Sequence, residues 1–199
     1  MDVSIPVWRS WTWLAWLNAA AKVALLALLA IAVLNPTLPQ FAGKAMGGRA
    51  LTFPIAVALV PVVWAVRFRR LPYPTLIDLL IVLPFLIDTA GNALNLYDSI
   101  DWWDDANHFV NWAIETSAVA LVLRSQPLEP LNRIALAFGF AVTTAVLWEF
   151  AEYVTFIRFS PELQTAYTDT LGDLAMGMSG GLLAAVGVTL LGDRSPTRQ

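Results

Sequence analysis

Cysteine is absent from this chain of 199 residues. Its absence excludes disulfide bonds, thiolate catalysis and zinc–thiolate sites. Charged residues are also scarce, at 14%, whereas soluble domains carry about a quarter. No basic patch with interleaved aromatic residues is present, so nucleic acid is excluded as a partner.

Hydrophobic residues make up 58% of the chain and form long runs along its whole length. Because a helix needs about 20 such residues to cross the hydrocarbon core, these runs predict an all-α fold, a polytopic membrane helix bundle. The first run is too long for a signal peptide, so we expect it to be retained. We predict one integral membrane domain over residues 1–199, with six spans at about 12–34, 50–67, 75–97, 106–124, 132–156 and 170–191.

The basic residues indicate the orientation, because cytoplasmic loops carry an excess of lysine and arginine. They predict that both termini are cytoplasmic and that the protein is a multi-pass component of a bacterial plasma (inner) membrane, embedded in its lipid bilayer. The cytoplasmic side would hold Arg9, Arg67, Arg69, Arg70, Arg124, Arg133, Arg194 and Arg198, and the opposite side Lys44, Arg49 and Arg158.

Tryptophan residues lie at both predicted interfaces, where they commonly anchor membrane proteins. Those of the inner interface are Trp11, Trp13 and Trp16, and those of the outer one are Trp102 and Trp103. Lys22 lies within the first span. We expect its side chain to snorkel toward the cytoplasmic headgroups, with a pair to a carboxylate inside the bundle as the alternative.

Carboxylates recur at the outer ends of the third and fourth spans. Asp88 lies in the outer half of the third span. The fourth span begins near His108, and Glu115 follows seven residues later on the same helical face. Asp104 lies four residues before His108 and is in place to orient its ring.

The last two spans repeat this arrangement. The fifth runs outward and ends with Glu149 and Glu152, and the sixth runs inward from Asp169 and Asp173. Asp169 has a second explanation as an acidic residue at a helix N-terminus. Gly177 continues its stripe at spacing four, a small-residue pattern that lets helices approach closely.

A charge at the membrane centre costs roughly 2.5–3.5 kcal/mol even on insertion scales. The nearby basic residues that we expect to offset so many acids are His108 and Arg158. Either some carboxylates keep a proton, or a divalent metal ion, Zn, Mn, Fe or Mg, neutralises them. The predicted metal ligands are His108, Glu149, Glu152, Asp169, Asp173, Asp88 and Asp104, and the predicted catalytic residues are His108, Glu115, Glu149, Glu152 and Asp173.

Three pairs, Asp104-x3-His108, Glu149-x2-Glu152 and Asp169-x3-Asp173, resemble the polar motifs of the YjdF-like family of bacterial inner-membrane proteins, and more distantly those of VanZ-like proteins. The resemblance extends from about Asp88 to the end of the chain. It implies that these six residues are the polar positions of the family and leaves the reaction open. VanZ-like proteins are associated with glycopeptide resistance.

Three functions remain open at this point. The first is a metal-dependent or acid–base enzyme acting on a lipid or a small envelope molecule at the extracytoplasmic side. The second is a cation- or proton-coupled transporter. The third is a non-catalytic envelope membrane protein. The acids lie off the midplane, and no internal repeat with broken helices is evident, which favours a one-sided site over transport.

Overall fold

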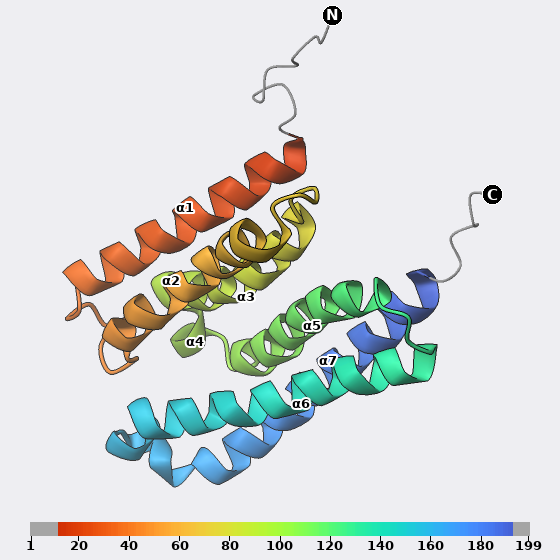
Figure 1. Cartoon of the computed structure of the whole chain (residues 1–199). Coiled ribbons are helices and arrows are strands. Elements are labelled where there is room, and N and C mark those ends of the chain that lie inside the picture. The colour runs from red at the N-terminus through yellow and green to blue at the C-terminus, as the bar shows by residue number, and fades with distance from the viewer. Residues whose placement is uncertain (1–11, 193–199) are drawn as a thin grey trace, which may run out of the picture.

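The computed structural model describes residues 12–192, which form helices and short connections without any strand. Three long helices come first and three last, with a short helix between the two sets (Figure 1). The helices are α1 (Trp13–Leu34), α2 (Met46–Val63), α3 (Thr75–Ala93), α4 (Leu96–Ser99), α5 (Trp103–Arg124), α6 (Pro130–Thr155) and α7 (Ala166–Gly192). A π-helix, η2 (Trp64–Phe68), extends α2, and two 3-10 turns, η3 (Ile157–Phe159) and η4 (Pro161–Gln164), link α6 to α7.

The predicted all-α membrane fold is confirmed. Within residues 12–192, five helices are long and apolar enough to cross a membrane, namely α1, α2 with η2, α3, α6 with η3, and α7. The fourth predicted span, 106–124, corresponds to α5, which is long enough but carries too many polar residues to qualify by composition. The transmembrane position of α5 therefore stays a prediction, as does the orientation. Arg9, Arg194 and Arg198, used for the orientation, and Trp11, expected at the inner interface, lie outside the described residues.

The helices form two groups of three. Helices α1, α2 and α3 pack on one another, and so do α5, α6 and α7. The groups are joined mainly where α3 packs against α5, and α2 and α6 face each other across the space between the groups (Figure 1). The polar residues of α5 therefore have protein neighbours on both sides, which lowers the cost of placing them at membrane depth.

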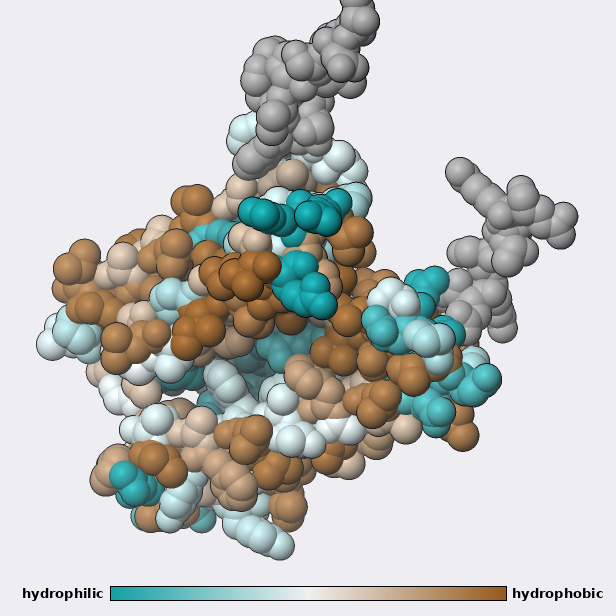
Figure 2. All heavy atoms as spheres, in the orientation of Figure 1, coloured by the Kyte–Doolittle hydropathy of each residue, from teal (hydrophilic) through white to brown (hydrophobic). Residues whose placement is uncertain are grey.

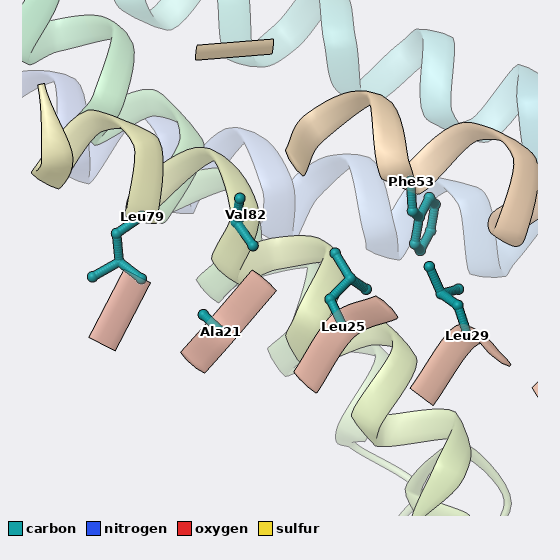
Figure 3. Close-up of a cluster of buried hydrophobic side chains, with 6 residues drawn as sticks. All are labelled: Ala21, Leu25, Leu29, Phe53, Leu79 and Val82. Atoms are coloured by element: carbon teal, nitrogen blue, oxygen red, sulfur yellow. The ribbon is translucent and has the colours of Figure 1, made fainter. Parts of the chain in front are cut away.

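Residues at helical spacing form the core of the first group. Ala21, Leu25 and Leu29 follow one another at intervals of four on α1, and they pack against Leu79 and Val82 of α3 (Figure 3). Side chains at this spacing lie on one face of a helix. The other faces of these helices expose large apolar side chains, as expected for helices surrounded by lipid.

The second group packs along stripes of buried residues, most of them small, and each stripe ends at an ionisable residue. Small side chains let helix backbones approach closely, and buried residues at spacing four bring the stripes together. The stripes are His108, Trp112, Thr116 and Ala120 on α5, Ala137, Ala141, Ala145 and Glu149 on α6, and Asp173, Gly177, Gly181 and Ala185 on α7. Close packing of the three helices thus places His108, Glu149 and Asp173 at one level.

Gly180 offers a test of this close packing. A Cβ at this position would lie 2.9 Å from the carbonyl carbon of Phe109 on α5, so the α5 backbone would have to move. We expect Gly180→Ala to lower the free energy of unfolding by about 1–3 kcal/mol, measured by thermal or denaturant unfolding in detergent. Gly187→Ala is the control because a Cβ there meets nothing within 4 Å. Equal stabilities of the two variants would contradict the packing.

Lys22 does not snorkel, and this prediction was wrong. Its Nζ lies 2.6 Å from Oδ2 of Asp78, which is fully buried. The same Asp78 oxygen accepts hydrogen bonds from the Asn18 amide and the Tyr73 hydroxyl, each at 2.6 Å. Pairing inside the bundle wins because the Asp78 carboxylate would otherwise be buried without a countercharge. Burial raises the pKa of Tyr73, which lies between spans, so its hydroxyl keeps the proton that it donates.

Candidate functional site

His108 lies at the centre of a group of carboxylates from three helices. Its Nδ1 is 3.8 Å from Oε1 of Glu149, and its Nε2 is 3.7 Å from Oδ1 of Asp173 and 3.6 Å from Oδ1 of Asp104. The His108, Glu149 and Asp173 side chains are at most 6% exposed, whereas that of Asp104 is 44% exposed. Both edges of one imidazole therefore face acids, and one side of the group opens outward.

Two sets of three side chains have the proximity that a metal ion requires. Asp104, His108 and Asp173 form one set, and His108, Glu149 and Glu152 form the other. Within each set the ligand atoms lie within 4.8 Å of one another. Donor atoms about 2.0–2.1 Å from one tetrahedral ion would be roughly 3.3 Å apart, so small side-chain rotations would close either set around a cation.

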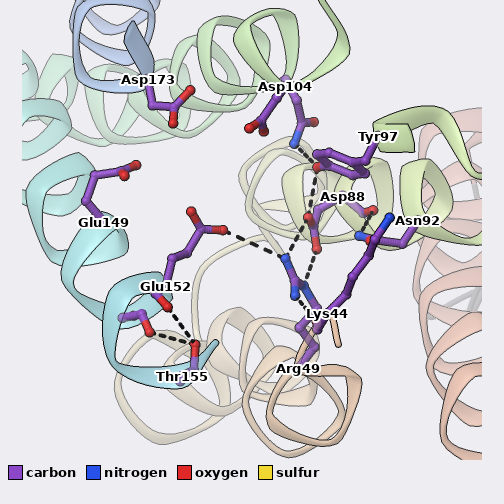
Figure 4. Close-up of polar contacts among 12 residues, drawn as sticks. Lys44, Arg49, Asp88, Asn92, Tyr97, Asp104, Glu149, Glu152, Thr155 and Asp173 are labelled. Carbon is purple, nitrogen blue, oxygen red and sulfur yellow. Dashed lines mark hydrogen bonds and ion pairs between the residues drawn. The ribbon is translucent and has the colours of Figure 1, made fainter. Parts of the chain in front are cut away.

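Arg49, in the first turn of α2, pairs with Asp88, which the sequence analysis predicted to be a metal ligand. Its Nε donates to Oδ2 of Asp88 at 3.0 Å and its Nη2 to Oδ1 at 3.4 Å (Figure 4). Nη2 also lies 3.8 Å from Oε1 of Glu152. The structure thus places Asp88 with Arg49 rather than in the sets around His108, while Glu152 lies between Arg49 and His108.

Tyr97 extends this network toward α5. Its hydroxyl donates to Oδ1 of Asp88 at 2.9 Å and accepts from the Asn107 amide, whose oxygen in turn accepts from Asn111 at 2.8 Å. Burial and the Asp88 carboxylate raise the pKa of Tyr97 well above its ordinary value, so the hydroxyl keeps its proton. Gly91 makes room for this arrangement, because a Cβ there would lie 2.9 Å from the Tyr97 ring.

A polar cavity of about 210 Å³, here called the vestibule, lies outside the His108 group. Its walls include Lys44 and Arg49 on one side and Asp104, Glu162 and Asp169 on another. Asp169 is exposed on this wall and belongs to neither set around His108. Partial desolvation of the Asp104 carboxyl, together with the neighbouring Asp169 carboxylate, raises the pKa of Asp104 to about 7. A cation in the vestibule would offset this repulsion.

A smaller cavity of about 40 Å³ lies on the inner side of His108. Glu115, Asn111 and Asp88 contribute its polar lining, and Trp112 and Trp148 its aromatic walls. The Asn111 side-chain oxygen is buried without a hydrogen-bond partner. Because one water needs about 10–15 Å³ of cavity volume and two or more polar partners, this cavity has room and polar groups for a few waters. Glu115 is therefore near His108 without belonging to either set of possible ligands.

The sequence reasoning missed the two basic residues that offset the outer acids. Arg49 pairs with Asp88 and Glu152, and Lys44 pairs with Asp98 at 2.8 Å. Arg158, the expected countercharge, instead lies over the Phe159 ring with its guanidinium carbon 4.4 Å from the ring centre. Arg49 lies at the edge of an apolar run, where an unpaired arginine is costly. That position could have predicted that Arg49 pairs with a carboxylate.

Comparison with known proteins gives one family and one relative. The profile of a family described as "Predicted membrane protein (DUF2238)" matches residues 17–194. A protein of Thermotoga maritima described as "Uncharacterized protein" is 31% identical over 101 residues, which cover 48% of this chain and 52% of the relative. The match thus spans about half the length of that relative. No solved structure matches the chain significantly.

Proposed function

Since the chain belongs to the DUF2238 family of predicted membrane proteins, we propose that it acts within the bilayer as a metal-dependent enzyme with its centre at His108. YjdF-like proteins form this family, so the resemblance seen in the acidic pairs is confirmed. The substrate would be a lipid or another small envelope molecule that reaches the vestibule. The orientation predicted from the basic residues places that vestibule on the extracytoplasmic side.

One observation supports the metal centre above all others. His108 is buried, and the described residues that approach its ring nitrogens are carboxylates at 3.6–3.8 Å. These separations are too long for hydrogen bonds and close to what ligands of one ion require. An oxygen-rich site with one imidazole suits Zn²⁺, Mn²⁺, Fe²⁺ or Mg²⁺.

The two edges of the imidazole are not equivalent. Glu152 beside the Nδ1 edge is also 3.8 Å from the Arg49 guanidinium, whose positive charge would oppose a cation there. Asp104 and Asp173 at the Nε2 edge have no arginine or lysine partner within residues 12–192. We therefore assign the metal to Nε2, Asp104 and Asp173. A small rotation of the Glu149 side chain, now 3.8 Å from Nδ1, would let it accept a hydrogen bond from Nδ1–H and fix the tautomer.

Three protein ligands leave positions open for water and substrate, as in catalytic zinc sites. Such a metal supplies a Lewis acid and lowers the pKa of a bound water to about 7. Glu149 holds the ring in position from the Nδ1 side. Glu115 lines the water-sized cavity next to His108 and is placed to accept a proton through it. Asp104 is half-exposed and lies where the centre opens to the vestibule.

Metal analysis of the protein purified in detergent tests this proposal. We expect about one equivalent of a divalent metal in the wild type and a loss of thermal stability when a chelator removes it. His108→Gln should lose the metal, because an amide is a poor replacement for imidazole as a ligand. Asp98→Asn is the control, since Asp98 lies on the vestibule wall paired with Lys44 and should leave the metal content unchanged. A metal-free wild type with unchanged stability in chelator would refute the proposal.

Proton or cation transfer is a second candidate, favoured by the polar residues that continue inward from His108. Asn111 and Glu115 line the small cavity, and the Thr116 hydroxyl one residue farther is buried without a partner. Such a row of groups with water is what a proton path requires. Proteoliposomes that hold a pH-sensitive dye would show a proton flux that Glu115→Gln abolishes. An absence of proton flux in the wild type would refute this second candidate and leave only the enzyme proposal.

A further inference from the structure

An apolar groove lies between α2 and α6. It encloses about 140 Å³, and its walls are formed by side chains that include Thr52 and Phe53 of α2 and Trp148 and Ala151 of α6. One end of the groove is polar, because Arg49 and Glu152 also line it. The groove therefore passes from an apolar region to charged groups, as a lipid does.

The groove and the vestibule share a border. Arg49, Glu152 and Phe156 line both spaces. On the viewed face, a hollow holds hydrophilic residues in its depth, and hydrophobic residues lie above it and to its sides (Figure 2). A molecule with its apolar part between α2 and α6 would thus have its polar end in the vestibule, beside the carboxylates of Glu152 and Asp104 (Figure 4).

The charges in the vestibule are divided between two walls. Lys44, just before α2, and Arg49, in its first turn, provide the positive wall. Lys44 uses one of its three N–H donors on Asp98, whereas the Arg49 guanidinium is already paired with Asp88 and Glu152, so Lys44 offers the remaining donors to an anion. Asp169 and Glu162, beyond α6, provide the negative wall, and neither forms an ion pair with another described residue. A ligand that carries both a phosphate and a primary ammonium would complement the two walls together.

We propose that the groove between α2 and α6 binds an acyl chain of an amine-bearing phospholipid of the phosphatidylethanolamine type. Its phosphate would lie against Lys44 and Arg49, and its ammonium group would donate hydrogen bonds to Asp169 and Glu162. The idea that this lipid is the substrate rests on the proposed metal centre, but its binding does not. A trimethylated headgroup has no N–H donor, and a glycerol headgroup has no positive charge, so both should bind more weakly.

Native mass spectrometry of the full chain in detergent, treated with chelator, would measure the preference. The probes are phosphatidylethanolamine, phosphatidylcholine and phosphatidylglycerol with identical oleoyl chains. We expect about tenfold tighter binding of phosphatidylethanolamine, which corresponds to one charge-assisted hydrogen-bonded contact. Asp169→Asn should reduce this preference without affecting the other two lipids. Equal binding of the three lipids, or a preference for phosphatidylglycerol, would overturn the proposal.

Filling the groove tests the position of the acyl chain. Ala151→Trp places an indole on the groove wall and should weaken binding of all three lipids about tenfold. Ala175→Trp is the matched control, because Ala175 is an exposed alanine of α7 that does not line the groove. Thermal unfolding of both variants checks that they fold. Unchanged lipid binding by folded Ala151→Trp would overturn the proposed location.

The two proposals fail separately. A wild type that prefers phosphatidylethanolamine but contains no metal would refute the metal centre and leave the lipid site. A wild type that binds one metal but shows no lipid preference would refute the lipid site and leave the metal centre. Repeating the lipid titration with and without metal adds a third result, because a lipid phosphate that contacts the ion should bind more tightly to the loaded protein.

Discussion

Metal affinity is expected to fall by more than about 100-fold when Asp173 is replaced by asparagine. Asp173 is buried, and its carboxylate would bind the ion directly beside Nε2 of His108. Losing a hydrogen-bonded partner outside the ligand set usually costs 10–100-fold in metal affinity, so losing a direct ligand should cost more. Isothermal titration with the metal found in the wild type would measure the change.

The order of effects among the acids distinguishes the two edges of the imidazole. Glu149→Gln should weaken binding about 10–100-fold, because it replaces the carboxylate beside Nδ1 by a neutral amide, which is a weaker acceptor. Glu152→Gln should change affinity less than about tenfold, since Glu152 is shared with Arg49 and lies outside the assigned ligand set. If Glu152→Gln costs more than Asp173→Asn, the metal binds at Nδ1 and the assignment to Nε2 is wrong.

Replacing Lys22 by methionine is expected to cause the largest loss of stability, about 3–5 kcal/mol. The methionine side chain keeps most of the volume but removes the charge 2.6 Å from the fully buried Asp78 carboxylate. The free energy of unfolding follows from denaturant titration in mixed micelles. The site around His108 lies in the other helix group, so the metal content of folded Lys22→Met should equal that of the wild type.

A double replacement shows whether the loss comes from the uncompensated charge. Lys22→Met combined with Asp78→Asn should recover at least half of the stability lost in Lys22→Met, because no buried charge then remains. The Asn18 and Tyr73 donors keep an oxygen acceptor in the double variant. If the double variant loses as much stability as the single variants Lys22→Met and Asp78→Asn together, Lys22 and Asp78 are not coupled and the ion pair is not the source of the stability.

The helices themselves could be predicted from the sequence. The first predicted span, 12–34, matches α1 at Trp13–Leu34, and the fifth, 132–156, lies within two residues of α6 at both ends. Long apolar runs specify helices almost alone, because backbone groups in lipid must form hydrogen bonds within their own segment. The predicted second span began at residue 50, whereas α2 begins at Met46, since the run ahead of it is short of large apolar residues.

The candidate site was only partly predictable. The spacing of residues along each helix predicted which ionisable side chains share a face. The structure brings five of them together, namely His108, Glu149, Asp173, Asp104 and Glu152. Spacing gave no information on which acid meets which base. The pairing of Asp88 with Arg49, 39 residues away, depends on α2 and α3 packing side by side. The separation of Asp169 from the His108 group depends on how α7 begins.

The sequence alone determined that this chain forms apolar helices and that most acids within them lie toward one end, because local hydrogen bonding and the cost of charge in lipid act on each segment separately. Tertiary structure alone decided the partners: Lys22 with Asp78, Arg49 with Asp88, and His108 between carboxylates of different helices. Those contacts depend on which small residues let which helices approach, as Gly180 does at Phe109. Ion pairing within a bundle is therefore a property of the packed helices, and no single helix specifies it.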